Sequence, residues 1–307
     1  MSEQYVTANG LRLAYDEFGN PDDPAMLLVM GLGTQMIAWP VDFCERLAAR
    51  GYRVIRFDNR DIGLSEKLEG TRTPHAFRLA LAARLGLPLK VPYTLFDMAK
   101  DAVGVLNALD IGAAHIVGAS MGGMIGQLMA GLYPFRVLSL TSIMSTTGRK
   151  TLPAADPKVS LHMIRRPVNA DRQDLEDYAM ETWRLIGSPG YPPTDEALRE
   201  KIAASYDRSF YPAGHRRQMA AIIASGDRVE LLRKVIAPTL VIHGKDDPLV
   251  PVEGGIDTAD LVPGARLEVI DGMGHDLPVP LIPHFVDLIA SHADEALSEP
   301  EAMASQA

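Results

Sequence analysis

The fold of this chain is decided by one short stretch, His115-Ile116-Val117-Gly118-Ala119-Ser120-Met121-Gly122-Gly123. Its first three residues form a buried-strand pattern. From Met121 onward, apolar residues repeat at the spacing of a helix that is buried nearly all round. Ser120 therefore stands in a sharp turn between a strand and a helix. Such a turn strains the serine backbone, exposes its hydroxyl and leaves room only for glycine two residues away on either side, where Gly118 and Gly122 stand. The stretch predicts that Ser120 is a nucleophile.

Short apolar runs that do not alternate with polar residues occur on both sides of this turn. They are Ala25–Met30, Val54–Phe57, Leu138–Ile143, Thr239–Ile242 and Leu267–Ile270. Such runs suit strands buried on both faces of a parallel sheet, and helical patterns such as Val41–Arg50 and Leu95–Leu109 separate them. The alternation predicts an α/β fold with a doubly wound, mostly parallel sheet and right-handed crossovers. Near the N-terminus, the turn pair Asn9-Gly10 predicts a hairpin over Gln4–Phe18.

A proline-rich region interrupts the alternation between strands and helices. Residues 147–226 combine prolines with short helical patterns at Asp174–Ile186 and Asp195–Tyr206, and they carry no convincing strand signal. We predict a helical cap inserted between two strands of the sheet. The core then comprises residues 1–146 and 227–293. A flexible tail is expected at 294–307, and a second, smaller excursion over Thr73–Pro92.

Composition and charge exclude several classes of protein. The chain has 307 residues, with 30 Lys and Arg against 39 Asp and Glu and a net charge of -9. A surface of that sign repels phosphate backbones, so no nucleic-acid partner is expected. The single cysteine, Cys44, excludes an internal disulfide framework and a cysteine-based metal cluster. No segment predicts a secretory leader or a membrane span, so we expect a soluble, cytoplasmic protein, and a homodimer is compatible with the sequence.

A serine nucleophile needs a base and a carboxylate. His275, in the loop Gly272-Met273-Gly274-His275 after the last predicted strand, is the expected base, because a glycine-rich loop can bring it over a neighbouring strand end. His243 is the rival, although a strand-end histidine is more often packed than catalytic. Asp246 and Asp247 follow another strand, and by composition either could be the carboxylate. The order Ser, Asp, His along the chain is that of the α/β-hydrolase arrangement.

Two further sets of residues complete the predicted site. The N–H of Met121 and, from the glycine-rich loop after Ala25–Met30, the N–H of Leu32 are the expected oxyanion donors, with Gly33 as the alternative to Leu32. Candidates for contact with the substrate are apolar or aromatic residues near the sheet edge or in the cap. They are Met36, Trp39, Met144, Trp183 and Tyr206. No cofactor and no metal is expected.

From Leu11 to Ile289 the chain resembles the α/β-hydrolase superfamily. The resemblance rests on the serine turn, the run Gly244–Pro251 and the loop Gly272–His275. It implies that Asp247 is the acid, because the family places it at that position of a Gly-x-x-Asp-x-x-x-Pro run. It also implies that Asp58–Ser65 is a structural turn. Within the superfamily the chain resembles aclacinomycin methylesterases and similar carboxylesterases, although Met30-Gly31 stands where His-Gly is commoner.

The resemblance and the residues together predict a serine carboxylesterase. Ser120 would attack the carbonyl of an uncharged, fairly hydrophobic, small-molecule ester, and water would then hydrolyse the acyl-enzyme. A carbon–carbon bond hydrolase or a perhydrolase on the same triad is the alternative enzyme. A ligand receptor that retains a hydrolase-like triad is a further alternative from a different class.

Overall fold

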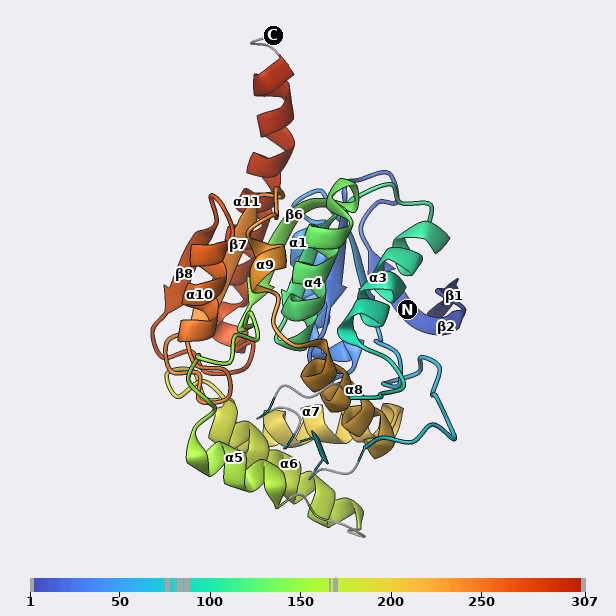
Figure 1. Cartoon of the computed structure of the whole chain (residues 1–307), viewed down its shortest axis with the longest axis vertical. Coiled ribbons are helices and arrows are strands. Elements are labelled where there is room, and N and C mark those ends of the chain that lie inside the picture. The colour runs from blue at the N-terminus through green and yellow to red at the C-terminus, as the bar shows by residue number, and fades with distance from the viewer. Residues whose placement is uncertain are drawn as a thin grey trace.

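The computed structural model describes residues 3–74, 78–79, 81, 85, 89–165, 167 and 171–304. Its centre is an eight-stranded sheet in the order β1-β2-β4-β3-β5-β6-β7-β8 (Figure 1). The strands are β1 (Gln4–Ala8), β2 (Leu11–Phe18), β3 (Ala25–Val29), β4 (Arg53–Phe57), β5 (Ala114–Ala119), β6 (Val137–Ile143), β7 (Thr239–Gly244) and β8 (Arg266–Ile270). Strand β2 pairs antiparallel with β1 and β4, and all other neighbours are parallel. The predicted fold class is therefore confirmed.

Helices cover both faces of the sheet. Outside the 147–226 region, the helices whose residues are described without a break are α1 (Val41–Ala48), α3 (Leu95–Ala108), α4 (Met121–Leu132), α9 (Val229–Leu232), α10 (Glu253–Leu261) and α11 (Ile282–Ala304), with short 3-10 turns at Met36–Ala38, Pro134–Arg136 and Val279–Leu281. Strand β3 shows why its sequence does not alternate. Leu27 and Val29 pack with α3 and α4, whereas Met26 and Leu28 pack on the opposite face with α1 and α11. Both faces are apolar because both are covered.

The predicted N-terminal hairpin is present as β1 and β2. Asn9 and Gly10 have φ values of 50° and 78°, the left-handed conformation that a tight hairpin turn requires. Along β2, Leu11, Leu13 and Tyr15 alternate with Arg12, Ala14 and Asp16, which predicts a strand with one solvated face, but the structure differs at Asp16. Asp16 is buried, because Arg56 on the neighbouring strand β4 bonds both of its carboxylate oxygens, at 2.7 Å and 2.9 Å.

Two further expectations need correction. The run Leu267–Ile270 does form a strand, β8, but β8 is the edge of the sheet, and Leu267 and Val269 are 37% and 39% exposed rather than buried on both faces. The segment expected as a flexible tail from 294 is helical as far as Ala304, since α11 continues through it. Its alanine, glutamate and leucine residues favour a helix.

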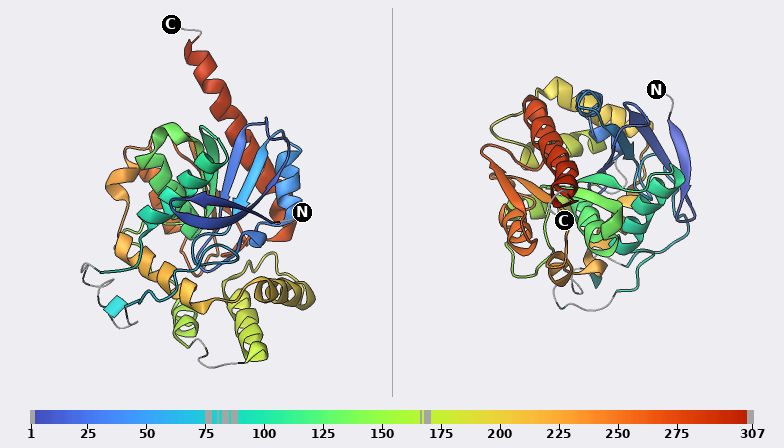
Figure 2. Two further views of the ribbon diagram at one scale, coloured as in Figure 1. Left: turned by 90° about the vertical axis from the view of Figure 1, so that its right-hand side faces the viewer. Right: turned by 90° about the horizontal axis from the view of Figure 1, so that it is seen from above.

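Of the described helices between β6 and β7, four lie in the 147–226 region, and α9 follows them. The four are α5 (Pro157–Ile164), α6 (Arg172–Ile186), α7 (Asp195–Arg208) and α8 (Pro212–Ser225), and we call them the cap helices. They gather at one end of the sheet, away from the end where α11 projects (Figures 1 and 2). Half of the residues in the expected excursion over Thr73–Pro92 lie outside the described residues. Within the described ranges, no helix combines the length and apolarity needed to cross a membrane.

Candidate active site

Ser120 occupies the sharp turn between β5 and α4. Its φ of 55° and ψ of -117° are strained for a residue with a side chain. A Cβ on Gly118 would overlap the carbonyl of Gly122, and a Cβ on Gly122 would overlap the carbonyl of Val29 on the neighbouring strand β3. The turn can therefore form only with glycine at both positions, which is the physical reason for the pattern seen in the sequence.

His275 lies between Ser120 and Asp247. Its Nε2 is 3.0 Å from Ser120 Oγ, and its Nδ1 is 2.7 Å from Asp247 Oδ2. The imidazole can accept the serine proton at Nε2 only if Nδ1 carries a hydrogen, and the carboxylate at Nδ1 favours that tautomer. The backbone N–H of His275 donates to the carbonyl of Ile186 at 2.6 Å, so the end of α6 helps to hold the histidine loop.

The Asp247 carboxylate stays ionised although it is buried. Burial raises its pKa, but the charge of His275 and hydrogen bonds from His243, His275 and the Val250 N–H outweigh that effect and lower the pKa to about 2. The backbone N–H groups of Leu249 and Val250 donate to Oδ1 at 2.9 Å and 2.8 Å, which leaves Oδ2 facing His275. The carboxylate can therefore balance an imidazolium charge without taking its proton.

The two alternatives that the sequence left open are separated by geometry. Asp246 accepts a hydrogen bond from the Gly272 N–H at 2.8 Å and so holds the start of the histidine loop. His243 is fully buried, with Nε2 2.8 Å from the carbonyl of Val250 and 3.5 Å from Asp247 Oδ2. Among the described residues, it is His275 that the structure brings to Ser120. Sequence analysis did not foresee that His243 approaches the same carboxylate.

The glycine-rich loop after β3 lies against the serine. A Cβ on Gly31 would come within 3.2 Å of Ser120 Cβ, so the loop passes directly beside the nucleophile. The Gly33 N–H donates to Gln218 Oε1 on α8 at 2.8 Å. It is therefore not available to donate to an oxyanion. In the described part of the chain, the N–H groups of Leu32 and Met121 donate no hydrogen bond, so both remain available for a ligand oxygen.

Gln218 is a residue that sequence analysis missed. Its side chain is fully buried and bridges the Gly33 N–H and the carbonyl of Arg60, which accepts from Nε2 at 2.9 Å. It thus fixes the loop after β3 from the cap side. A glutamine within α8 carries no local signal of this contact, because its partners lie more than 150 residues away in the chain.

The predicted substrate contacts separate into two groups. Met36 and Trp39 have no exposed surface, and Met144 is 3% exposed. The N–H of Met36 donates to the buried Asp58, and Trp39 stacks on Phe43 in the core, so these residues are packed inside the protein and offer little surface to a ligand. The two cap residues differ from them and from each other.

Trp183 and Tyr206 are both partly buried in the cap helices. The Tyr206 ring is held between Phe210, at 4.8 Å, and the guanidinium of Arg172, also at 4.8 Å. The Trp183 ring lies beneath the ammonium group of Lys201, 4.1 Å from ring centroid to Nζ. Trp183 therefore stays a candidate for contact with the substrate, and Lys201 is its neighbour.

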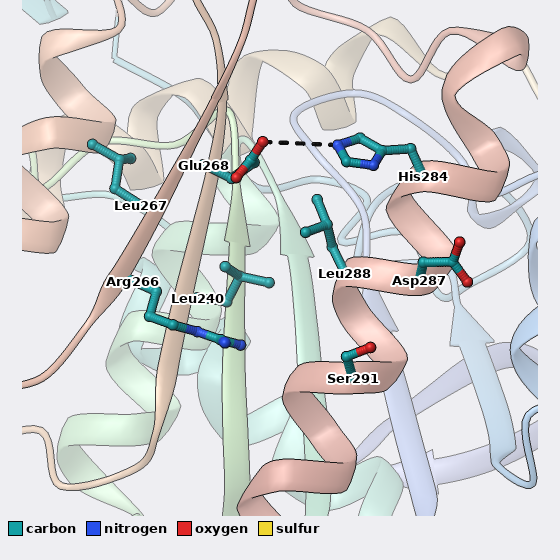
Figure 3. Close-up of a pocket in the computed structure, with 8 residues that line it drawn as sticks. All are labelled: Leu240, Arg266, Leu267, Glu268, His284, Asp287, Leu288 and Ser291. Carbon is teal, nitrogen blue, oxygen red and sulfur yellow. Dashed lines mark ion pairs between the residues drawn. The ribbon is translucent and has the colours of Figure 1, made fainter.

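One hollow of about 330 Å³ lies elsewhere, between β7, β8 and α11. Figure 3 shows Glu268 and His284 facing each other across it, 3.8 Å apart. Its lining residues belong to the amino-terminal parts of β7 and β8 and to one face of α11, whereas Ser120 and Asp247 follow the carboxyl ends of their strands. In open α/β sheets ligands bind outside the carboxyl ends, so this hollow is not the candidate active site.

Comparison with known proteins defines the class of protein to which this chain belongs. Residues 24–279 match the family model of the alpha/beta hydrolase fold, and the chain belongs to that family. It is accordingly an enzyme of the hydrolase class.

The chain is also similar to individual hydrolases with named activities. The chain is 31% identical to a rhodomycin D methylesterase of Streptomyces sp. (strain C5), across 96% of this chain and 99% of the relative. It is 29% identical to a 2-hydroxy-6-oxononadienedioate/2-hydroxy-6-oxononatrienedioate hydrolase of Burkholderia vietnamiensis, across 86% and 85%. Its fold is similar to that of a meta-cleavage product hydrolase from Pseudomonas fluorescens, with a TM-score of 0.74, 20% identity and coverage of 95% and 98%.

Proposed function

We propose that the protein hydrolyses carboxylic esters with Ser120 as nucleophile, His275 as base and Asp247 as the carboxylate that orients the base. The proposal rests on the continuous pair of contacts from Asp247 through His275 to Ser120, placed on a strained turn that exposes the hydroxyl. The similarity to a methylesterase over nearly the whole chain supports an ester as the substrate.

The reaction follows from the positions of these groups. His275 Nε2 takes the proton of Ser120 Oγ as the serine oxygen bonds to the ester carbonyl carbon. The carbonyl oxygen becomes an oxyanion, and the N–H groups of Leu32 and Met121 donate to it. His275 then protonates the leaving alcohol, and a water molecule activated by the same nitrogen hydrolyses the acyl-enzyme. This chemistry requires no cofactor or metal.

The main substrate, on this proposal, is a fairly hydrophobic small molecule that reaches the serine between the cap helices and the carboxyl ends of the strands. Trp183, which is partly buried in α6, is the cap residue that we expect to contact it. The sequence also predicts that the substrate is uncharged. A cytoplasmic location and a homodimer stay predictions.

The proposal is tested with 4-nitrophenyl esters from acetate to palmitate and with Ser120→Ala in parallel. We expect turnover on part of the series and a loss of at least about 10⁴-fold in kcat for the variant, because the nucleophile acts together with its base. Circular dichroism and thermal unfolding would check that the variant stays folded. A folded Ser120→Ala protein with wild-type esterase activity contradicts the proposal.

A carbon–carbon bond hydrolase on the same triad is the second candidate. It is favoured by the 29% identity to a hydrolase whose name gives two compounds, 2-hydroxy-6-oxononadienedioate and 2-hydroxy-6-oxononatrienedioate. A conjugated diketone without any ester separates the two candidates. Cleavage of the diketone in the absence of ester turnover would select the second.

A further inference from the structure

The end of α6 lies against the loop that carries His275. Three successive residues of that loop are each hydrogen-bonded to residues that end or follow α6. The backbone N–H of His275 donates to the Ile186 carbonyl at 2.6 Å, and that of Gly274 donates to Ser188 Oγ at 2.9 Å. Asp276 Oδ1 accepts from the Ser188 backbone N–H at 3.0 Å and from the Ser188 hydroxyl. The residue before His275 and the residue after it are therefore tied to the same serine.

The Ser188 hydroxyl is the centre of this contact. It accepts from the Gly274 N–H and donates to Asp276 Oδ1, so it is used both as an acceptor and as a donor. Ser188 is 2% exposed, and Gly274 is buried as well. A buried donor that loses its partner costs about 1–3 kcal/mol. Without the hydroxyl, the loop would therefore move to satisfy the Gly274 N–H.

Close approaches of the backbone show that the two segments meet without a side chain between them. A Cβ on Gly274 would lie 2.4 Å from the Gly187 carbonyl oxygen, and a Cβ on Gly190 would lie 2.9 Å from Gly272 Cα. The Gly190 N–H also donates to the Gly272 carbonyl at 2.9 Å. The contact between the cap and the histidine loop is therefore one of backbone against backbone, on both sides of Ser188.

The sheet region holds the beginning of the same loop. Asp246 Oδ2 accepts from the Gly272 N–H at 2.8 Å, and the Asp246 N–H donates to the Met273 carbonyl at 3.0 Å. The next two backbone N–H groups, those of Gly274 and His275, donate to the residues at the end of α6 instead. The cap therefore holds the part of the loop that bears the imidazole.

We propose that Ser188 is a positioning residue for His275, with Asp276 as its hydrogen-bond acceptor. The inference rests on the proposed function and deepens it, because it makes part of the cap necessary for holding His275 Nε2 at 3.0 Å from Ser120 Oγ. Catalytic groups must stay within about 0.5 Å of their productive geometry, and a displacement of about 1 Å can lower the rate about 100-fold. Ser188 acts through the loop and not on the reacting atoms.

The test begins with Ser188→Ala on the preferred 4-nitrophenyl ester. We expect kcat to fall about 30-fold and KM to change about three-fold or less, because proton transfer at Nε2 is misaligned while the groups that bind the ester stay. Ser160→Ala is the matched control on α5, because its hydroxyl makes only a local contact with the Ala155 carbonyl, and it should leave kcat unchanged. Thermal unfolding would check that both variants are folded. A folded Ser188→Ala protein with wild-type kcat overturns the proposal.

Two substitutions of Asp276 separate position from charge. The charge of its carboxylate interacts with that of His275, so its removal could by itself lower the rate. Asp276→Asn removes the charge but keeps an oxygen that accepts from Ser188, and we expect it to retain kcat within about three-fold. Asp276→Leu has a similar size without an acceptor, and it should lose about as much as Ser188→Ala. Equal losses in the two Asp276 variants would assign the effect to charge and overturn the positioning role.

Amide hydrogen exchange gives a readout that does not depend on activity. The N–H groups of Gly274 and His275 are hydrogen-bonded, so the peptide that contains them should exchange at least about ten-fold faster in Ser188→Ala than in the wild type or in Ser160→Ala. If the wild type hydrolyses no ester, faster exchange still supports the hold on the loop, and the proposed function alone fails. Unchanged exchange in Ser188→Ala contradicts the inference, whether or not the protein is an esterase.

Discussion

The sheet around Ser120 and the cap helices are held together in different ways. Every residue of β5 is buried, and α4, which starts directly after the serine, is buried along nearly its whole length. In α6 and α7, by contrast, few residues are buried, and their apolar contacts form a small cluster around Met180. Surface ion pairs such as Arg184–Asp195 add little, since exposed pairs contribute about 0–1 kcal/mol.

This difference indicates that the sheet region and the cap helices have different roles. Dense packing fixes the serine, the histidine and the aspartate, whose chemistry tolerates little displacement. The cap touches that arrangement at a few defined points, such as Ile186 against the histidine loop and Gln218 against the loop after β3. The cap can therefore vary its side chains, and with them the substrate, while the chemistry of the site stays the same.

The largest effect is expected inside the sheet region, at Asp247. Asp247→Asn should lower kcat by about 10⁴-fold with little change in KM, because the amide no longer favours the tautomer that leaves Nε2 free to accept the serine proton. Steady-state kinetics on the preferred 4-nitrophenyl ester would measure this. A loss below ten-fold would show that the carboxylate is not needed to orient His275.

The same variant changes how stability depends on pH. The pKa of Asp247 falls from 3.8 to about 2 on folding, so its stabilisation is present above about pH 4 and is lost as pH falls through 2. That shift corresponds to about 2 kcal/mol. In urea unfolding between pH 5 and pH 2, Asp247→Asn should therefore lose about 2 kcal/mol less than the wild type. Equal losses would contradict the assignment.

A smaller but still large effect is expected at the serine turn. Gly122→Ala should destabilise the protein by about 3 kcal/mol in urea unfolding, because its methyl group would overlap the Val29 carbonyl. Gly112→Ala is the control, since a methyl group there meets nothing within 4 Å, and it should change stability by about 0.5 kcal/mol or less. Similar stabilities for the two variants would show that the turn can relax.

The smallest effect is expected where the cap touches the sheet region, at Gln218. Gln218→Ala should lower kcat about ten-fold at nearly constant KM, because the loop that carries Leu32 loses its support while both oxyanion donors remain. Gln173→Ala, the same change at an exposed position of α6, should leave kcat unaltered. A rise in KM alone would assign Gln218 to substrate binding instead of loop positioning.

The sequence is informative where structure depends on neighbouring residues. Gly118, Ser120 and Gly122 lie within one turn, so their spacing is enough to predict the strand, the bend and the helix. The apolar runs predict the strands for the same reason. Position in the sheet is a different matter, because the exposure of Leu267 depends on which strands have a neighbour and not on the run itself.

Contacts between residues that lie far apart in the chain could not be predicted from neighbouring residues. The hydrogen bond between Gln218 and Gly33 and the approach of His243 to Asp247 depend on how the loops meet at the end of the sheet. The contact between Lys201 and the Trp183 ring is visible only once α6 and α7 are placed together. A helical pattern shows that such residues face inward or outward, but it does not identify their partners.

The environment of Cys44 has a practical consequence. This residue has no exposed surface, and burial raises the pKa of its thiol to about 12, so almost no thiolate exists at neutral pH. Alkylating reagents and mild oxidants should leave the native chain untouched. A cysteine introduced on a cap helix would therefore be the sole reactive thiol, and a probe attached to it could follow movement of the cap against the sheet without removal of any native residue.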